Sequence, residues 1–447
     1  VNTLSTSIYA DPNAKDKFWQ NSSINLLNAL VLAIIDYAKR NNKWEEVTMD
    51  NVLHMMTELG AKQVSLNKDG DIIPSEQDME HNPDIMVPKD TEVKTMKNKL
   101  IVYFEHLQKL NEVDHSQFRQ MALDAFAQSK FAGDETSGNI YSSAMEGIKI
   151  YQQTDIAKLT SMNSVNFEKL GFPRTMKLKL PQKFCFKTAV VSFLDESGKI
   201  LEKRTQLIDK VGMLKYAIET KLPDHFNVQI SFDYRKNDPE IRNYTGLIHG
   251  SKVYERVFGH YKYDEYTKKP ILKRISLQDD AKDKYAIKFS HESINYSEAP
   301  VALFFVTPPN NPSYNQLPAF AVDQIFNSLY AMALDNGRKC FRRVHFILDE
   351  FGGMPAINDM SVKAQICLGQ NICFTLVVQN LEQLSLKYSR EQAATIQSNC
   401  SNLLYILTKS KETAQTISSM IGKRTVAVHT DSGKVGNVHS TSYNTSY

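Results

Sequence analysis

The 447-residue sequence lacks several features that would each have indicated a class of protein. Its five cysteines form no CxxC pair and lie beside no histidine cluster, which argues against a structural zinc site or a disulfide framework. They are Cys185, Cys340, Cys367, Cys373 and Cys400, and their apolar settings predict reduced, buried thiols in a cytosolic compartment. No signal peptide opens the chain, and the longest apolar run, Ile24 to Ile35, is too short and too polar to span a bilayer.

An excess of charge of one sign is missing as well. The net charge is only +3, so there is no global basic field, and any nucleic-acid contact would use a local patch or one surface of an assembled ring. Hydrophobic residues make up 42% and charged residues 23% of the chain, as in ordinary soluble globular proteins. The length allows about two to four domains with a sizeable core.

A phosphate-binding loop of the form GxxxxGK[ST] is also absent. Gly198-Lys199, Gly422-Lys423 and Gly433-Lys434 all lack the first glycine of that motif, five residues upstream, and the hydroxyl residue after the lysine. Because backbone N–H groups of that loop hold the phosphates, this chain alone is expected to bind nucleotide weakly. The first residue is Val rather than Met, so we expect the chain to begin inside a longer protein.

The hydrophobic pattern divides the chain into five segments. A short leader, 1–12, precedes an all-α domain, 13–160, in which apolar residues recur at a period near 3.6. From 165 to 295 the period becomes two, as in Met176–Leu180, which predicts a β-rich inserted domain. A further domain, 296–429, alternates apolar runs with helices, and 430–447 is polar enough to predict a flexible tail. Within the all-α domain we expect a polar loop from about 67 to 90 and helices near 92–110, 116–131 and 139–151.

The 296–429 segment is an α/β domain by pattern. Four apolar runs are each followed by a helical stretch, which indicates a parallel sheet covered on both faces. The expected strands are Val301–Val306, Val344–Leu348, Phe374–Val378 and Leu403–Leu407. The expected helices are Pro318–Leu334, Ser361–Gly369, Glu391–Ser398 and Lys411–Met420.

Two carboxylates and an amide follow successive strands of this sheet. Asp349 and Glu350 end the strand from Val344, and Gln379 ends the next strand. At the carboxyl edge of a parallel sheet such groups face the ligand crevice. There Asp349 can hold the water shell of Mg²⁺ on ATP, and Glu350 can orient or deprotonate the attacking water. Gln379 is placed to sense the γ-phosphate, as in RecA-like motors. A solvated acidic turn and an ordinary strand-end amide remain the simpler alternatives.

The segment Leu348-Asp349-Glu350-Phe351-Gly352-Gly353-Met354-Pro355 resembles a signature of type IV secretion coupling proteins, the TraG/TraD-like conjugation ATPases. Other segments resemble motifs of the same family in the same order. They are Asp11-Pro12 through Phe18-Trp19, Ala299–Pro308, Val378–Leu384, Asn399-Cys400, and Glu412-Thr413-Ala414 through Gly422. The resemblance is loose over 1–160 and closer over 296–428.

This resemblance implies a RecA-like core of the P-loop NTPase type, here without its P-loop segment. It implies an ATP-driven coupling protein, using ATP and Mg²⁺, that delivers relaxase-bound single-stranded DNA to a type IV secretion channel. The expected partners are the DNA, relaxase and relaxosome proteins, channel components and, in a homo-hexamer, further copies of the protein. A membrane anchor and the P-loop are expected upstream of Val1, which would put this chain at the cytoplasmic face of the cell membrane. The isolated chain is expected to be inactive.

The sequence departs from the family pattern in two places. Where the family has a Gly-Arg pair before the Gln-bearing strand, this chain has Gly369-Gln370, so a trans-acting charge would come from Arg390 or Arg424. The β-rich stretch is not part of the common core. Among its aromatic and basic residues, Phe232, Tyr234 and Arg235 are candidates for stacking on bases, although a packed core explains the aromatics more simply.

Two other functions stay open from sequence. In one, the chain is a non-catalytic receptor that docks relaxosome proteins on its α and β domains. In the other, it belongs to an unrelated RecA-like DNA translocase. Two membrane helices and a GxxxxGK[ST] loop in the upstream reading frame would favour the coupling protein.

Overall fold

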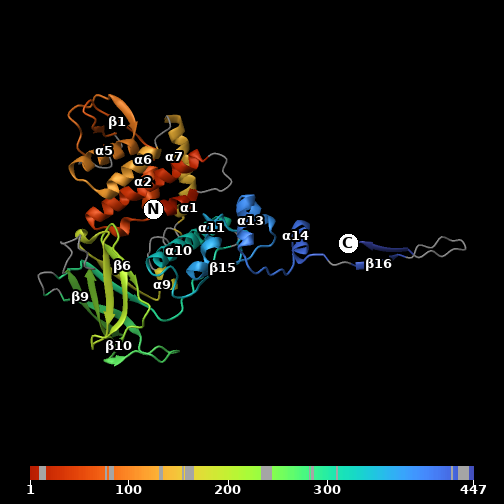
Figure 1. Cartoon of the computed structure of the whole chain (residues 1–447). Coiled ribbons are helices and arrows are strands. Elements are labelled where there is room, and N and C mark those ends of the chain that lie inside the picture. Colours follow the sequence, from red (N-terminus) through yellow and green to blue (C-terminus); the bar gives the residue numbers. More distant parts are fainter. Residues whose placement is uncertain are drawn as a thin grey trace.

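The structure is a computed structural model that describes residues 1–9, 17–75, 78–79, 85–129, 134–153, 156, 166–232, 244–280, 282, 286–308, 311–423, 426–430 and 442–446. Figure 1 shows a helical domain, a β domain and a C-terminal α/β part, with the α/β part beside both. Each has a separate cluster of buried apolar side chains, so each forms its own core. Asp11 and Pro12 of the predicted leader lie outside the described residues.

The helical domain is built around a long central helix, α2. Its apolar side chains are buried on most sides because α6, α1 and α7 pack against it. The described helices are α1 (Asn2–Tyr9), α2 (Phe18–Asn41), α3 (Met49–Met55), α5 (Lys99–Val113), α6 (Gln117–Ser129) and α7 (Asp134–Ile148). Thr48 caps α3 by accepting from the backbone N–H of Asn51, a role for which threonine is favoured.

The same domain contains a small antiparallel sheet, so the all-α prediction is wrong for residues 63–98. Its strands are β1 (Gln63–Leu66), β2 (Ile72–Ile73) and β3 (Thr95–Asn98). These strands are too short and too polar to produce a visible two-residue period, which is why the pattern indicated only a loop. The side chain of Asn67 accepts from the N–H groups of Asp69 and Asp71 and forms the turn between β1 and β2.

Among the described residues, α2 is the one helix long and apolar enough to cross a membrane by length and composition. The sequence interpretation judged the apolar run from Ile24 to Ile35 too short to span a bilayer, whereas the helix that contains it extends from Phe18 to Asn41. In the structure most of α2 is buried inside the helical domain, and Leu26, Leu27 and Leu30 have no more than 1% of their surface exposed. That placement favours a core helix.

The β domain consists of a five-stranded and a three-stranded antiparallel sheet that share one core. The larger sheet has the order β12-β9-β8-β5-β6 and the smaller one β13-β4-β7. The strands are β4 (Arg174–Lys179), β5 (Thr188–Leu194), β6 (Ile200–Leu207), β7 (Met213–Ala217), β8 (His225–Phe232), β9 (Thr245–Tyr254), β12 (Leu272–Asp279) and β13 (His291–Tyr296), with the short β10 (Arg256–Val257) and β11 (His260–Tyr261) at one end.

Phe232 belongs to this core and is not free to stack on bases. Its ring lies on that of Phe184, with centroids 4.5 Å apart and planes 13° from parallel. The base-stacking interpretation is therefore wrong for Phe232, because the alternation along β8 turns the ring toward the interior. Tyr234 and Arg235 lie outside the described residues.

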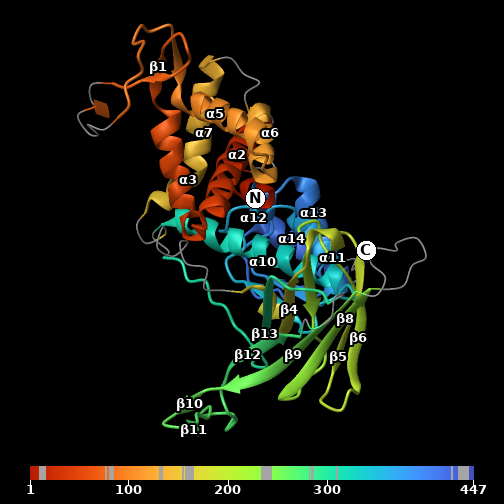
Figure 2. The ribbon, with the colours of Figure 1, turned by 90° about the vertical axis from the view of Figure 1, so that its left-hand side faces the viewer.

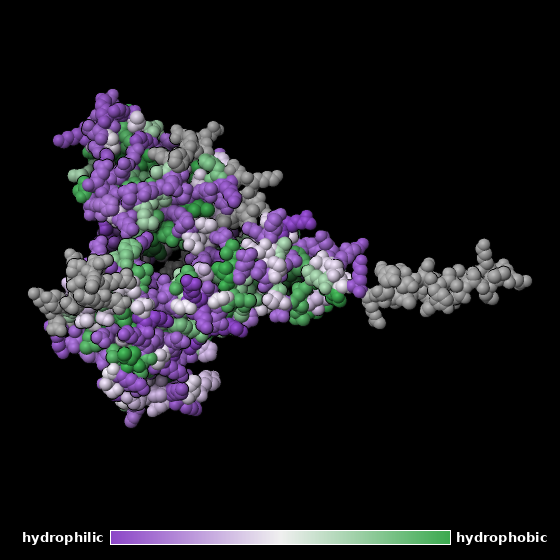
Figure 3. Space-filling model, in the orientation of Figure 1, coloured by the Kyte–Doolittle hydropathy of each residue, from purple (hydrophilic) through white to green (hydrophobic). Residues whose placement is uncertain are grey.

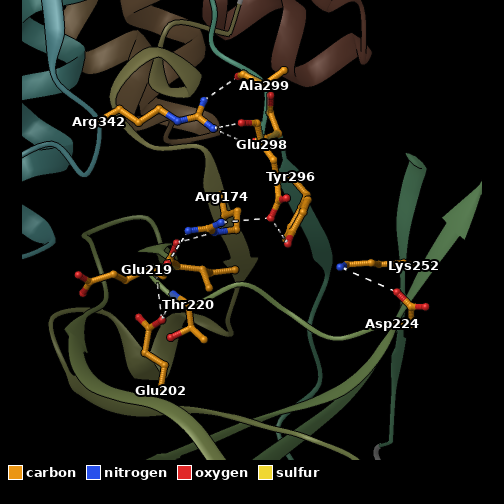
Figure 4. Close-up of polar contacts among 12 residues, drawn as sticks. Arg174, Glu202, Glu219, Thr220, Asp224, Lys252, Tyr296, Glu298, Ala299 and Arg342 are labelled. Carbon is orange, nitrogen blue, oxygen red and sulfur yellow. Dashed lines mark hydrogen bonds and ion pairs between the residues drawn. The ribbon is translucent and has the colours of Figure 1, made fainter. Parts of the chain in front are cut away.

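A polar junction joins the β domain to the α/β part (Figure 4). The guanidinium of Arg342 donates to the carbonyl oxygens of Ser297, Glu298 and Ala299, the three residues that follow β13. On the other side of the junction, buried Asn336 accepts the backbone N–H of Ala217 through its side-chain oxygen at 2.7 Å. The chain after β13 and the end of β7 are thereby both bonded to the α/β part.

The α/β part surrounds a two-stranded parallel sheet of β14 (Val344–Leu348) and β15 (Ile372–Leu376). Helix α10 (Gln316–Asp335) covers one face of that sheet through a stack in which the Phe374 ring lies 5.0 Å from Phe346 and 5.9 Å from Phe326. The other helices are α9 (Glu168–Gly171), α11 (Met360–Ile366), α12 (Glu382–Lys387), α13 (Arg390–Ser398) and α14 (Lys411–Ile421).

Two of the four expected strands, 301–306 and 403–407, are not strands in the structure. A strand needs a neighbouring strand to satisfy its backbone N–H and C=O groups. Within the described residues, no strand pairs with either segment. Their side chains are largely exposed, with Val306 at 90% and Leu404 at 85%. In the region predicted as a flexible tail, β17 (Ser442–Ser446) pairs antiparallel with β16 (Val426–Thr430).

The five cysteines are all free, but only Cys340 and Cys367 are buried as expected. Burial raises the pKa of the Cys340 thiol to about 12, so this group is an inert core side chain. Cys185 and Cys373 are half-buried, and Cys400 is exposed.

A buried ion pair lies inside the α/β part, and the helical domain contacts it through Ser7. The ammonium group of Lys363 on α11 lies 2.7 Å from the carboxylate of Asp323 on α10, and both side chains are almost fully buried. Ser7 on α1 donates its hydroxyl to the same carboxylate, and Asn327 donates its amide at 3.1 Å. Lys363 also donates to the carbonyl of Asn358.

Replacing Lys363 with Met is expected to destabilise the chain by about 3–5 kcal/mol, because Asp323 would keep its charge in the interior without a cation. Chemical denaturation followed by circular dichroism measures this change. The exposed neighbour Lys339→Met serves as control and should change stability by less than about 0.5 kcal/mol. Wild-type stability of Lys363→Met would contradict the role of the pair.

Candidate functional site

The carboxyl ends of β14 and β15 meet at one edge of the sheet. The two strands run parallel and pair from Val344 with Ile372 to Leu348 with Leu376. Beyond them, the N–H of Val377 donates to Leu348 O at 3.0 Å, and the N–H of Phe351 donates to Val377 O at 3.1 Å. The structure therefore places the segment of Asp349 and Glu350 beside the segment that leads to Gln379.

Asp349 and Glu350 present free carboxylates at this edge. Both are exposed, and within the described part of the chain neither carboxylate has a hydrogen-bond or ion-pair partner. The main chain around them is fixed, because Gly353 and Met354 donate their N–H groups to Glu350 O at 2.9 and 3.1 Å.

These carboxylates suit a cation that is bound mainly through water and phosphate. Mg²⁺ keeps several waters and takes one or two carboxylates together with substrate phosphates. A cluster of three or more His, Cys, Asp or Glu side chains that would hold a metal directly does not occur among the described residues. The donor set fits Mg²⁺ only when a nucleotide completes it.

Phe351 anchors the loop that follows the carboxylates. Its side chain is 2% exposed and stacks on Tyr388, with ring centroids 5.8 Å apart. The Tyr388 hydroxyl accepts the backbone N–H of Ile357 at 3.0 Å, so Tyr388 contacts the loop at both Phe351 and Ile357. Burial raises the pKa of Tyr388, which therefore stays neutral.

Gly352 and Gln383 form a contact between the loop that follows Asp349 and Glu350, here called the carboxylate loop, and the loop that contains Gln379, here called the Gln379 loop. The side-chain oxygen of Gln383 accepts the backbone N–H of Gln379 at 3.1 Å. A Cβ atom on Gly352 would lie 2.2 Å from that oxygen and 2.7 Å from the Gln383 amide carbon. A side chain at 352 would therefore push aside the Gln383 amide that holds Gln379.

A second set of contacts ties the Gln379 loop to α14. Glu382 accepts the hydroxyls of Ser410 at 2.7 Å and Thr413 at 2.8 Å, while the N–H of Leu381 donates to Thr413 Oγ1 at 3.0 Å. These two hydroxyl donors lower the pKa of Glu382. The position of Gln379 thus depends on α14 as well as on β15.

The structure does not show either candidate arginine at the site. Arg390 is the exposed first residue of α13, directly after the capping residue Ser389. Arg424 lies outside the described residues, and Gln370, at the family's arginine position, belongs to a short 3-10 helix before β15.

Sequence reasoning missed Gln383 and the structural roles of Phe351 and Gly352. The signal available was the Phe-Gly-Gly run directly after the two carboxylates and the second glutamine four residues after Gln379. Neither feature indicates a contact by itself, because the two segments are about 30 residues apart in the chain.

Comparison with known families places these residues in context. Residues 1–176 match the family described as Type IV secretory system Conjugative DNA transfer, and residues 343–447 match the one described as TraM recognition site of TraD and TraG. The chain belongs to the type IV secretion coupling proteins of the TraG/TraD type. No curated protein and no solved structure matches the chain.

The match confirms the resemblance found in the sequence and gives the coupling protein a part in conjugative DNA transfer. Coupling proteins of this type are membrane-associated, and the transfer family typically consists of ATPases. The interval between the two matches, 177–342, contains β5 through α10, so most of the β domain lies outside both family segments.

Gly352→Ala is expected to destabilise the coupling protein by about 1–3 kcal/mol, because its Cβ would displace Gln383. Thermal or chemical denaturation measures the loss. Gly353→Ala is the matched control, since a Cβ there meets nothing closer than 3.5 Å and its backbone needs no positive φ. Equal effects of the two substitutions would show that the Gly352–Gln383 contact is unimportant.

The free energy of unfolding should depend on pH through Glu382, and the substitution Glu382→Gln should remove that part of the pH dependence. Its pKa is lower in the folded chain than in the unfolded one, so its contribution is complete above the ordinary glutamate pKa of about 4.3 and is lost as pH falls through the lowered value. Denaturation midpoints at neutral and acidic pH for both proteins measure the difference. An identical pH dependence would contradict the two hydroxyl contacts.

Proposed function

We propose that the intact coupling protein hydrolyses ATP to deliver relaxase-bound single-stranded DNA to a type IV secretion channel. The observation that supports this most is the position of Asp349 and Glu350 beside the Gln379 loop, at the carboxyl edge of parallel strands, in a chain of the coupling-protein family. The proposal includes a homo-hexamer at the cytoplasmic face of the membrane, where each copy of this chain would be held by an anchor in another segment of the protein.

Each residue of the edge has a distinct role in this proposal. Mg²⁺ bound with ATP supplies charge neutralisation at the phosphates. Asp349 holds the water shell of that cation, which its exposed and unpaired carboxylate allows. Glu350 orients the attacking water and accepts its proton, and Gln379 donates its amide toward the γ-phosphate. Arg390 and Arg424 are the candidates for charge supplied to a neighbouring copy.

The exposed apolar surface supports a RecA-like core that is completed by additional strands. Parallel sheets are normally covered on both faces, yet Ile347 of β14 and Val377, the residue directly after β15, are exposed. Figure 3 shows hydrophobic side chains gathered at the surface of the α/β part near β15 and toward α14. The unpaired segments 301–306 and 403–407 would become strands of that larger sheet, next to the segment that supplies the phosphate-binding loop.

The C-terminal match supports contact with the relaxosome. That family segment is described as a TraM recognition site, and it covers the candidate site, α14 and the β16–β17 hairpin. We include a TraM-like relaxosome protein, the relaxase and components of the secretion channel among the partners of the intact protein.

Glu350→Gln in the full-length protein should lower ATP turnover by about 100-fold or more and abolish DNA transfer, because the amide cannot accept the proton of water. Steady-state phosphate release and a mating assay measure the two effects. Unchanged thermal stability is expected, since the side chain is exposed and unpaired among the described residues.

The control for this experiment is Glu412→Gln, the same change at an exposed position on α14, which should leave both activities intact. Normal transfer by Glu350→Gln would overturn the catalytic assignment and favour a non-catalytic receptor. The isolated 447-residue chain should have no appreciable ATPase activity. A robust rate that depends on Glu350 in this chain would contradict the need for a separate phosphate-binding loop.

A further inference from the structure

The β domain carries a projecting ribbon, residues 254–274, which we call the arm. Figure 2 shows β10 and β11 beyond the ends of β9 and β12, away from the helical domain and the α/β part. The arm is ordered by its own hydrogen bonds. At its base Glu255 donates its N–H to Ile271 O at 2.8 Å, and Lys262 donates to Glu255 O at 2.9 Å. A bridge between Tyr263 and Pro270 closes a second turn.

The first turn holds a phenylalanine in solvent. Phe258 and Gly259 join β10 to β11 with φ angles of 50° and 86°, the combination of a type I′ turn. Asn-Gly is the favoured pair there, and a bulky residue with positive φ is costly. Phe258 is 99% exposed, so no packing within the described chain offsets that cost.

The second turn holds a tyrosine in the same way. The carboxylate of Asp264 accepts the N–H of Tyr266 at 3.1 Å and both the N–H and the hydroxyl of Thr267, at 2.7 and 2.8 Å. These bonds fix the loop while Tyr266 remains 92% exposed. The arm thus ends in two ordered turns, each of which presents an aromatic ring to solvent.

Positive charge is concentrated on the same ribbon. The arm contains six of the chain's 53 lysines and arginines and three of its 50 acidic residues, so it alone accounts for the net charge of +3. All six cations are exposed, namely Arg256, Lys262, Lys268, Lys269, Lys273 and Arg274. Among the acids, Asp264 is occupied by its turn, and Glu255 pairs with Lys262 at 3.6 Å.

Not every aromatic side chain of the arm is available to a ligand. The Tyr261 ring meets Tyr254 edge-on at 5.9 Å and lies under the guanidinium of Arg256 at 4.7 Å. These three side chains contact one another at the base of the arm, and these contacts explain their positions. Phe258 and Tyr266 have no such explanation.

We propose that the arm binds single-stranded nucleic acid. Phe258 and Tyr266 stack on unpaired bases, and the cations from Lys268 to Arg274 hold the phosphates between and beside them. Exposed aromatic rings beside exposed cations are what unpaired bases and a sugar-phosphate backbone require. A duplex would not serve, because its bases are already stacked.

An anionic membrane surface fits the arm less well. Inserting the Tyr266 turn into lipid would carry the exposed carboxylate of Glu265 with it, at a high cost of desolvation. The choice of DNA over RNA rests on the proposed function. The assignment of the arm as a binding surface does not rest on the proposed function, because the arm lies outside both family segments and is separate from Asp349 and Glu350.

Fluorescence anisotropy of the 447-residue chain with a labelled poly-dT strand tests the proposal. The strand should bind, and a duplex of equal length should bind more weakly. Phe258→Ala with Tyr266→Ala should weaken binding to the strand by at least ten-fold. Lys268→Gln with Lys269→Gln should weaken it and also reduce the salt dependence of the affinity. Both variants should fold normally, since the altered side chains are exposed.

The chain offers matched controls for both variants. Phe186 is also exposed and has a φ of 61°, but it lies outside the arm, so Phe186→Ala should bind as wild type. Lys203→Gln with Lys210→Gln removes two exposed cations from the β domain outside the arm and should have a much smaller effect than the arm variant.

Three outcomes would overturn the assignment. The tip variant is the double substitution Phe258→Ala with Tyr266→Ala. The outcomes are no binding of the strand by the wild-type chain, wild-type affinity of the tip variant for the strand, and a tip variant that loses binding to phosphatidylserine vesicles while its binding to the strand is unchanged. Glu350→Gln separates this proposal from the proposed ATPase. That variant should bind the strand normally, and the tip variant of the full-length protein should keep its basal ATP turnover.

Discussion

The arrangement of the chain depends on one buried charge, the carboxylate of Asp323. This carboxylate accepts hydrogen bonds from the hydroxyl of Ser7 on α1 and the amide of Asn327 on its own helix, and it pairs with the ammonium group of Lys363 on α11. Lys363 in turn donates to Asn358, which follows the carboxylate loop. A charge in the interior demands these partners, and so the beginning of the helical domain and the neighbourhood of Glu350 are joined through a single group.

The sequence predicted those features that depend on local pattern. The strand Val344–Leu348, the helix over most of Gln316–Asp335 and the meeting of Asp349 with the Gln379 segment all follow from apolar periodicity and parallel topology. The next strand was predicted two residues too late, as Phe374–Val378 instead of Ile372–Leu376. Features that depend on distant partners were not predictable. Segment 301–306 is apolar enough for a strand but has no neighbour, and the fit of Gln383 against Gly352 joins two loops that no pattern connects.

The candidate site combines fixed main chain with free side chains. Phe351, Gly352 and Gln383 hold the loops in place, whereas the carboxylates of Asp349 and Glu350 and the amide of Gln379 stay exposed. This division is favourable for a site that acts on a ligand it does not fully enclose, because the geometry is set before the ligand arrives. The motif shared with coupling proteins thus contains two kinds of residue, those that shape the loop and those that face outward.

The junction around Arg342 and Asn336 has a mechanical consequence. Arg342 donates hydrogen bonds to the carbonyl groups after β13, and Asn336, which follows α10, accepts one from the end of β7. These bonds restrict rotation of the β domain relative to the α/β part. The arm stands at the far end of that domain. If the β14–β15 sheet rotated about this junction, the β domain would rotate with it, and the displacement would be large at Phe258 and Tyr266 because the arm is distant from the junction.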